Sequence, residues 1–139
     1  MSTARWEHFE HEADIGVRGI GPTLSSAFEQ AALALSAIIT DLELIEAHEV
    51  VEINCVEEDI PLLLADWLNA LIFQTATRKL LFSRFEVNIN GAHLTASAWG
   101  EPIDIEKHHP AVEIKGATYT ALDVHQQAGE FVAQCVVDV

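Results

Sequence analysis

The sequence is short of basic residues. Only seven lysines and arginines stand against 22 aspartates and glutamates, which gives a formal net charge of −15 over 139 residues. Nucleic-acid binding depends on clustered Lys and Arg side chains that neutralise phosphates, whereas the few bases here are scattered along the chain. The charge therefore argues against direct binding of RNA or DNA, and it favours a divalent cation or a basic protein as partner.

Cysteines and long apolar runs are also scarce. Cys55 and Cys135 have no CxxC spacing, which favours buried free thiols in a reducing cytoplasm over a disulfide. No uninterrupted apolar run reaches the ~18 residues that a membrane helix needs, and the first residues lack the apolar core of a signal peptide. We therefore expect a cytoplasmic protein with no membrane association.

Recognisable catalytic motifs are missing as well. The chain has no P-loop, no GxSxG and no HExxH, and neither cysteine has a base beside it in the sequence. The seven histidines show no zinc spacing with thiol or acid support. We expect surface or capping roles for them, including His8, His11, His108 and His109. From the residues alone, no standard catalytic set emerges.

What the sequence does contain is clear periodicity. Half of its residues are apolar, enough for the core of a single domain spanning residues 1–139. Apolar residues at helical spacing predict helices over about 24–39 and 60–75. Thr23 is a plausible N-cap for the first helix, and the run Glu57-Glu58-Asp59 is a strong start signal for the second.

Strand patterns occupy most of the remainder. Alternation predicts strands over 50–56, 80–89 and 94–100, with Asn90-Gly91 as the hairpin turn between the last two. We further expect a first strand ending at 17–20, an irregular segment over 101–110, one strand over 112–124, a turn at 126–129 and a final strand over 131–139. This order predicts an α+β fold with two helices packed on a largely antiparallel sheet.

The most unusual stretch runs from His8 to Gly16. It carries two histidines and three carboxylates before entering the first strand. Because burying unpaired charge is costly, these side chains are expected at the edge of a sheet, where a rigid strand can hold polar ligands. The stretch is therefore a candidate metal or binding site, with Asp14 as its main carboxylate.

A second anomaly is Asp138, which interrupts an apolar terminal strand one residue before the sequence ends. Asp14, Asp138 and the α-carboxylate of Val139 would together supply the oxygen ligands that Ca²⁺ or Mg²⁺ prefers. The alternative is that Asp138 simply points to solvent from the end of its strand. Lys115 would either pair with an acid such as Glu130 on a neighbouring strand or meet a phosphate or carboxylate.

Several short motifs, taken in order along nearly the whole chain, resemble the archease family. They are His11-Glu12-Ala13-Asp14-Ile15-Gly16, Thr23-Leu24 with Ala27-Phe28, Asp66-Trp67-Leu68-Asn69, Gly100-Glu101, Val112-Glu113-Ile114-Lys115 with Thr118-Tyr119, and Val137-Asp138-Val139. Two positions depart from the family pattern. Glu12 stands where the family usually has Thr, which alters the charge of the site, and Thr120 stands where His is common, which removes any role for that histidine.

The resemblance implies an accessory protein, not a stand-alone enzyme. Its partner would be the GTP-dependent RNA ligase of the RtcB type, which acts in tRNA splicing and RNA repair. Such a protein promotes guanylylation of the ligase and lets it turn over repeatedly. The resemblance also implies a bound divalent cation, calcium first and magnesium or manganese as alternatives, held by Asp14, Asp138 and Val139. Lys115 and His11 would meet the partner or a nucleotide phosphate.

Two other functions remain open from the residues alone. A small metal-dependent hydrolase could use His11, Asp14 and Asp138, although no nucleophile is recognisable, and turnover by the isolated protein would support it. A general chaperone-like binding module would stimulate unrelated partners and would be indifferent to substitution of Asp14.

Overall fold

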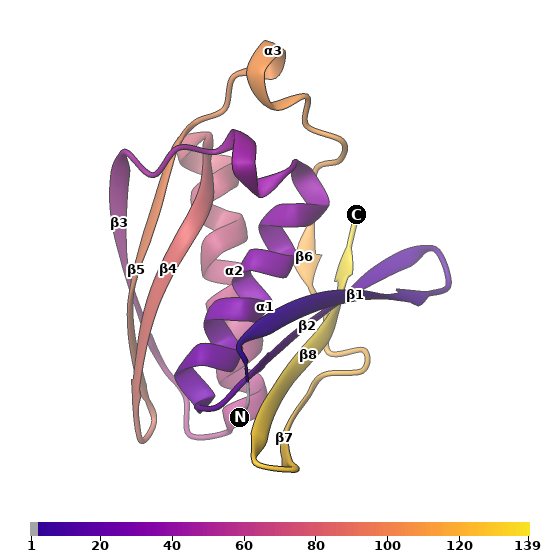
Figure 1. Ribbon diagram of the computed structural model, residues 1–139, viewed down its shortest axis with the longest axis vertical. Helices are drawn as coiled ribbons and strands as arrows, with labels where there is room; N and C mark the ends of the chain where they lie inside the picture. Colours follow the sequence, from indigo (N-terminus) through magenta and orange to yellow (C-terminus); the bar gives the residue numbers. More distant parts are fainter. Residues whose placement is uncertain (1–2) are drawn as a thin grey trace.

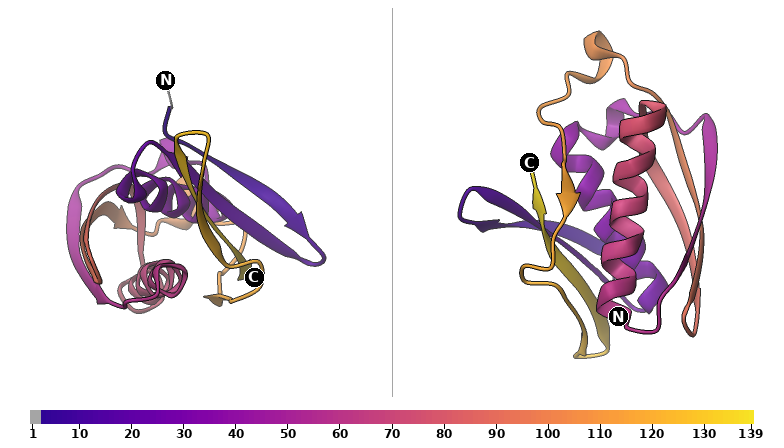
Figure 2. Two further views of the ribbon diagram at one scale, coloured as in Figure 1. Left: turned by 90° about the horizontal axis from the view of Figure 1, so that it is seen from below. Right: turned by 180° about the vertical axis from the view of Figure 1, so that it is seen from behind.

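Two long helices lie between two antiparallel sheets (Figure 1). The computed structural model describes residues 3–139. Helix α1 (Leu24–Ile39) and helix α2 (Ile60–Arg78) each contact strands of both sheets. Figure 2 shows the same arrangement from below and from behind, with the helices in the centre. The predicted α+β class is confirmed, although the strands form two sheets instead of one.

The larger sheet is built around the last strand. Strand β8 (Glu130–Asp138) pairs with β2 (Asp14–Gly21) on one side, and with β6 (Gly116–Ala117) and β7 (Asp123–Gln127) on the other. Strand β1 (Arg5–His11) pairs with β2 as a hairpin at the edge. All these pairings are antiparallel.

The smaller sheet has the order β3-β5-β4 and consists of β3 (Glu49–Val56), β4 (Leu80–Asn90) and β5 (His93–Pro102). The predicted β4–β5 hairpin is present, but Asn90 pairs with His93, so that Gly91 and Ala92 form the turn. Gly91 has φ of 61°, a left-handed conformation that glycine adopts without steric cost.

Both helices begin where the sequence predicts. Thr23 and Ser26 form a reciprocal capping box at α1, and the side chain of Asp59 accepts a hydrogen bond from the Leu62 amide at α2. Helix α1 ends at Ile39 as expected, whereas α2 continues to Arg78, three residues beyond the predicted end at 75. The αL conformation of the next residue, Lys79, ends the helix.

The core lies between the helices and the inner faces of the sheets. Trp67 of α2 is fully buried, and its indole N–H donates to the carbonyl of Phe28 in α1 at 3.1 Å. Gly19 of β2 allows α1 to approach closely, because a Cβ at that position would overlap backbone atoms of Ala27 and Ala31. Such contacts fix α1 against the larger sheet.

Helix α2 is long and apolar enough to cross a membrane by length and composition, with a mean hydropathy of 1.2. The search for an uninterrupted apolar run did not detect this helix, because Asp66 interrupts its apolar sequence. A core helix passes the same test, and α2 buries Leu63, Leu64, Trp67, Leu68 and Leu71 in the interior of this fold.

Three predictions of secondary structure were wrong. The predicted strand over 112–124 is a loop with the two-residue β6, followed by a turn at Tyr119–Leu122 and then β7, because Ile114 turns into the core and Ala121 takes a positive φ of 53°. The predicted turn at 126–129 is shorter, since β7 runs to Gln127. The irregular segment over 101–110 contains part of β5 and a short helix, α3 (Ile105–His108).

Candidate functional site

The β1–β2 hairpin and the end of β8 meet at one end of the larger sheet. His11 pairs with Asp14 across the hairpin, Ile15 pairs with Val137 in the β2–β8 ladder, and Gly116 pairs with Asp138 in the β6–β8 ladder. Continuing the β2–β8 register by one residue sets Asp14 beside Asp138. Sequence positions from opposite ends of the chain therefore become neighbours through strand pairing.

The two aspartates also share a face of the sheet. The next residues along the two strands are Ile15 and Val137, and their side chains belong to the face that packs against the helices. Because side chains alternate along a strand, Asp14 and Asp138 project from the outer face. His11, directly opposite Asp14, lies on that face as well. Asp138 is exposed, while His11 and Asp14 are half-buried.

Neither aspartate has a polar partner of its own. Within residues 3–139, the carboxylates of Asp14 and Asp138 accept no hydrogen bond and form no ion pair. Carboxylate oxygens at adjacent ends of two paired strands are the kind of ligand that suits a hard divalent cation. Asp14 and Asp138 therefore supply the donor chemistry that the predicted cation site requires.

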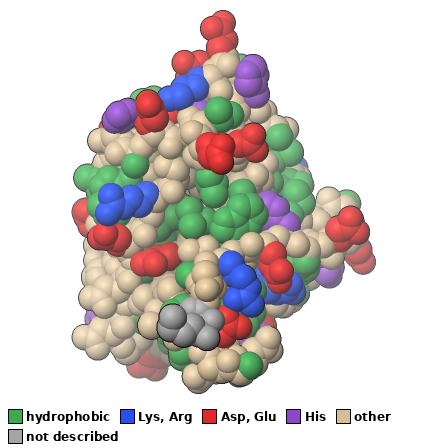
Figure 3. Space-filling model, viewed as in Figure 1, with side chains coloured by type: hydrophobic (Ala, Val, Ile, Leu, Met, Phe, Trp, Pro, Cys, Tyr) green, Lys and Arg blue, Asp and Glu red, His purple; other side chains and the backbone are tan. Residues whose placement is uncertain are grey.

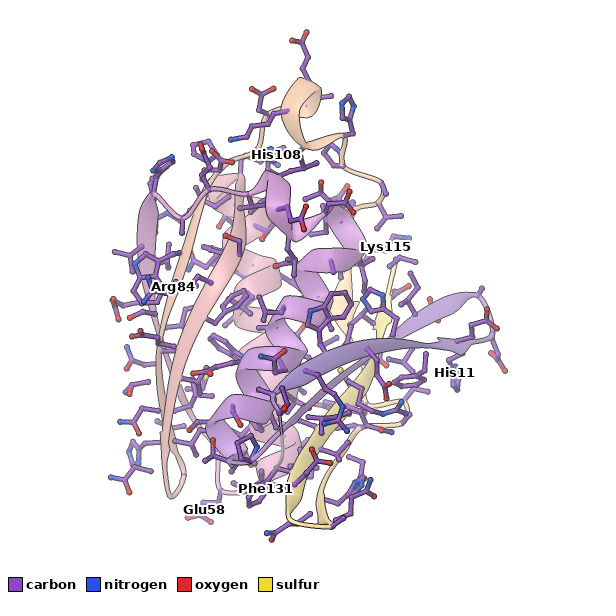
Figure 4. All side chains as sticks on the ribbon, viewed as in Figure 1. His11, Glu58, Arg84, His108, Lys115 and Phe131 are labelled. Atoms are coloured by element: carbon purple, nitrogen blue, oxygen red, sulfur yellow. The ribbon has the colours of Figure 1, made fainter. Side chains whose placement is uncertain are left out.

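Lys115 lies next to this pair but does not make the predicted contact with Glu130. Its backbone N–H donates to the carbonyl of Asp138 at 2.7 Å, and its side chain is exposed. Glu130 instead pairs with Arg5 at 2.7 Å, at the other end of β8. Figure 4 shows Lys115 near the end of β8, while His11 lies farther out on the hairpin.

The hairpin that carries Asp14 is stiffened by an aromatic layer. The Phe9 ring covers Gly16, where any Cβ would overlap the ring. The Arg18 guanidinium lies 4.5 Å from the centroid of that ring and hydrogen-bonds to Glu7 at 2.7 Å and to Gln134 at 2.9 Å. Sequence analysis missed the hairpin because its turn, Glu12-Ala13, has neither glycine nor asparagine, and Glu12 adopts a φ of 54°.

A second residue missed by sequence reasoning is Asn69. Asp66 and Asn69 are both exposed on α2. The Asn69 amide nevertheless accepts from the Ala117 N–H at 2.9 Å and donates to the Ala117 carbonyl at 3.3 Å. One side chain thus bonds to both the N–H and the carbonyl of Ala117 in β6, and it positions the segment that carries Lys115.

A separate polar cluster surrounds Glu101, which is 8% exposed. Its carboxylate accepts from the Glu46 backbone N–H at 2.9 Å, from Lys107 Nζ at 2.8 Å and from His108 Nε2 at 2.9 Å. Burial by itself would raise the pKa of Glu101, but the hydrogen bonds from Lys107, Glu46 and His108 lower that pKa to about 2.

His108 belongs to this cluster and corrects a prediction. Of the two roles expected for it, a place at the surface was wrong, because His108 is 1% exposed. A capping role agrees with its contact to Asp104, the N-cap residue of α3. Its Nδ1 accepts from the Asp104 N–H at 2.9 Å, which leaves the proton on the Nε2 that faces Glu101. Because a strand end at Glu101 and the short helix α3 meet here, the imidazole serves as a link between them.

Glu46, His48 and Glu101 are the one set of His, Cys, Asp and Glu side chains in the described chain whose ligand atoms all lie within 4.8 Å of one another. Lys107 Nζ already contacts Glu46 at 3.1 Å and Glu101 at 2.8 Å. Since the ammonium group supplies the positive charge at this point, the set is a satisfied structural network.

The best-formed apolar pocket, of about 220 Å³, lies elsewhere. Its walls come from the ends of α1 and α2 and from the segment over 103–114; the residues are Ile39, Ile72, Thr75, Ala76, Lys79, Leu81, Ile103, Pro110, Val112, Glu113 and Ile114. His11, Asp14 and Asp138 take no part in it. A hydrolase that used those three residues would need a substrate cavity beside them. This pocket is not such a cavity.

Comparison with known families agrees with the sequence motifs. A model described as the Archease protein family (MTH1598/TM1083) matches residues 6–139. The chain belongs to the archease family. Protein archease of Pyrococcus abyssi is 41% identical over 140 residues, covering 97% of this chain and 99% of the relative. Protein archease of Sulfurisphaera tokodaii is 36% identical over 137 residues, with the same coverage.

Solved structures of archeases share the fold. The solution structure of Methanobacterium thermoautotrophicum protein 1598 superposes with a TM-score of 0.85 at 37% identity, covering 96% of this chain and 98% of the other. The crystal structure of an archease and possible chaperone from Thermotoga maritima gives a TM-score of 0.59 at 20% identity, covering 96% of each chain. The second likeness bears on the fold alone.

Proposed function

We propose that this archease-family protein is an accessory factor of a GTP-dependent RNA ligase of the RtcB type. It would promote guanylylation of the ligase and its repeated turnover in tRNA splicing and RNA repair. Family membership supports an accessory protein. The observation that carries the proposal is the pair of unpartnered carboxylates, Asp14 and Asp138, at adjacent ends of β2 and β8 with Lys115 beside them.

In this proposal, Asp14, Asp138 and Val139 hold a divalent cation, with calcium preferred over magnesium or manganese. Flexible oxygen ligands of this kind suit Ca²⁺, whereas Mg²⁺ demands stricter geometry. The bound cation would supply positive charge for a phosphate group. Lys115 would meet a nucleotide phosphate, and His11, on the same face as Asp14, would contact the ligase.

The charge distribution supports a protein partner. A net charge of −15 attracts the basic surface that an RNA-binding enzyme presents, and it speeds association at low salt. Figure 3 shows acidic side chains at the tip of the β1–β2 hairpin and few isolated Lys and Arg side chains on this face. The hairpin tip would therefore enter the ligase, and the protein would not touch RNA.

The second candidate is the general chaperone-like binding module that the residues alone leave open. It differs from the first candidate in one measurable way. A chaperone that acts through apolar contacts would stimulate unrelated proteins and would tolerate loss of Asp14.

The test is guanylylation of a cognate RtcB-type ligase with GTP and a divalent metal, with and without this protein. We expect stimulation by the wild type and loss of stimulation in Asp14→Ala and Asp138→Ala. Glu106→Ala, which removes an exposed acid on α3, is the charge-matched control and should behave as wild type. Full stimulation by Asp14→Ala would overturn the role of the site, and turnover of a phosphoester by the protein alone would favour the hydrolase.

A further inference from the structure

The smaller sheet has two edges that are treated differently. At the β4 edge, helix α1 covers the outward backbone groups: the Val87 N–H donates to the Glu29 carboxylate at 2.8 Å, and the Ile89 N–H donates to the Ser25 hydroxyl at 3.3 Å. Burial raises the pKa of Glu29, and its bond to Val87 opposes that rise. A half-buried carboxylate of α1 therefore covers this edge of the sheet.

The β3 edge has no such cover. Strand β3 pairs only with β5 among the described strands, and it forms the outer margin of the molecule in both Figure 1 and Figure 2. The Glu57 N–H donates to the Ala92 carbonyl at 2.9 Å. Because hydrogen-bonded positions recur at every second residue, the odd-numbered residues of β3 bond to β5. The backbone groups of Val50, Glu52, Asn54 and Val56 therefore face outward.

The side chains at these four positions are exposed, including the apolar Val50 at 50% and Val56 at 65%. An antiparallel second copy centred on Ile53 would place Val50 opposite Val56 of that copy, and Glu52 opposite its Asn54. Valine would meet valine, and each carboxylate would meet an amide that can donate to it. In this register Glu52 does not face another Glu52 at the centre of the strand. At each end, Glu49 faces Glu57 of the copy, and this like-charge contact adds to the repulsion between the copies.

We propose that a second copy of this chain pairs with the β3 edge, joining the two smaller sheets into one continuous sheet across a two-fold axis at Ile53. All four outward-facing residues would be in hydrogen-bonded pairs, which gives about eight backbone hydrogen bonds, two for each pair. The strand nearly repeats its own pattern when reversed, and this self-complementarity is what selects a copy over a foreign strand.

Charge sets the conditions for this pairing. Each copy carries a net charge of −15, so the copies repel one another at low ionic strength, and salt screens that repulsion over about 8 Å at 0.15 M. The dimer should therefore strengthen as salt is added. The hairpin with Asp14 lies on the far side of the molecule from β3 (Figure 1), so pairing leaves the candidate site open and does not depend on the proposed function.

Sedimentation equilibrium from micromolar to millimolar protein, at low and high salt, tests the dimer. We expect the apparent mass to rise toward twice the monomer mass, and to rise further with salt. Glu52→Pro removes an N–H that points away from β5, which an edge strand tolerates, and it should return the protein to a monomer. Glu52→Ala keeps that N–H and should still dimerise.

Cross-linking tests the register. In a Cys55→Ser background, Val50→Cys with Val56→Cys should give a covalent dimer on oxidation, because hydrogen-bonded partners lie about 5.5 Å apart at Cα. Val50→Cys alone should not cross-link. A monomer at millimolar protein in high salt would overturn the proposal and leave the edge to a foreign strand. A dimer unchanged by Glu52→Pro, or cross-linking by Val50→Cys alone, would overturn it equally.

Discussion

Two groups of carboxylates in this fold differ in burial and in their hydrogen-bond partners. Glu101 is buried and has three hydrogen-bond donors, among them Lys107 and His108. Asp14 and Asp138 lie side by side at the end of the larger sheet with no such donor among the described residues. A buried carboxylate must be satisfied for the fold to be stable, whereas an unsatisfied pair stabilises nothing and keeps its ligand positions free. The contrast separates a structural site from a candidate functional one.

The largest expected effect concerns function alone. Asp14→Ala and Asp138→Ala should reduce stimulation of ligase guanylylation to the level of the ligase alone. Their free energy of unfolding without metal should stay within about 0.5 kcal/mol of wild type, because neither side chain makes a hydrogen bond or ion pair within residues 3–139. Calcium should raise the Tm of the wild type, since a ligand that binds only the native state stabilises it, and it should not raise the Tm of either variant. If either variant were destabilised without metal as much as Glu101→Gln, Asp14 and Asp138 would have a structural role, and the distinction between the two groups of carboxylates would be wrong.

Glu101→Gln should show the reverse behaviour. The amide cannot satisfy Lys107, His108 and the Glu46 N–H together, so we expect a loss of about 2 kcal/mol in the free energy of unfolding. Urea denaturation measures it, with Glu106→Gln on the exposed side of α3 as the matched control. Stimulation of the ligase should persist at a temperature where the variant is folded. A variant as stable as wild type would show that the cluster is not structural.

The same cluster should make stability depend on acid. The pKa of Glu101 is lowered from 4.5 to about 2 in the folded protein, so its contribution is fully present above pH 4.5 and is lost as pH falls toward 2. The difference in unfolding free energy between wild type and Glu101→Gln should therefore shrink over that range. Urea titrations at a series of pH values measure the difference, and a constant gap would contradict the assignment.

The smallest effect is expected at Asn69. Asn69→Ala removes both hydrogen bonds to Ala117 and should cost about 1 kcal/mol of stability. Because β6 carries Lys115 into place, stimulation of the ligase should fall several-fold while calcium still raises the Tm. Hydrogen exchange at the Ala117 amide should accelerate. Asp66→Ala, at another exposed position of α2, is the control, and an equal effect there would mean that Asn69 is not a specific clamp.

The helices and most strands could be predicted because their signals are local. The apolar spacing of α1 and the caps at Thr23 and Asp59 depend on residues within a few positions of one another. The segment over 112–124 failed for the opposite reason. Its alternating apolar residues suit a strand, but Ile114 is buried in the core. That burial depends on tertiary packing, which a local pattern does not encode.

The candidate site was predictable in its residue types but not in its geometry. Asp14 and Asp138 stood out because carboxylates are costly within apolar strands. The burial of His108 and the clamp by Asn69 gave no comparable signal, because both depend on partners that lie far away along the chain or on another element. A pair with Glu130 was one of the two roles considered for Lys115, but the structure pairs that glutamate with Arg5.

The sequence by itself determined the acidic surface, the two long helices and the β4–β5 hairpin. It also showed two aspartates, Asp14 and Asp138, at unusual positions in apolar strands. Only the tertiary structure decided that Asp14 and Asp138 are neighbours, that Glu101 is satisfied and that the β3 edge is open. The physical reason is that composition and short-range periodicity set local conformation, whereas strand order and register are set by the burial of a whole core.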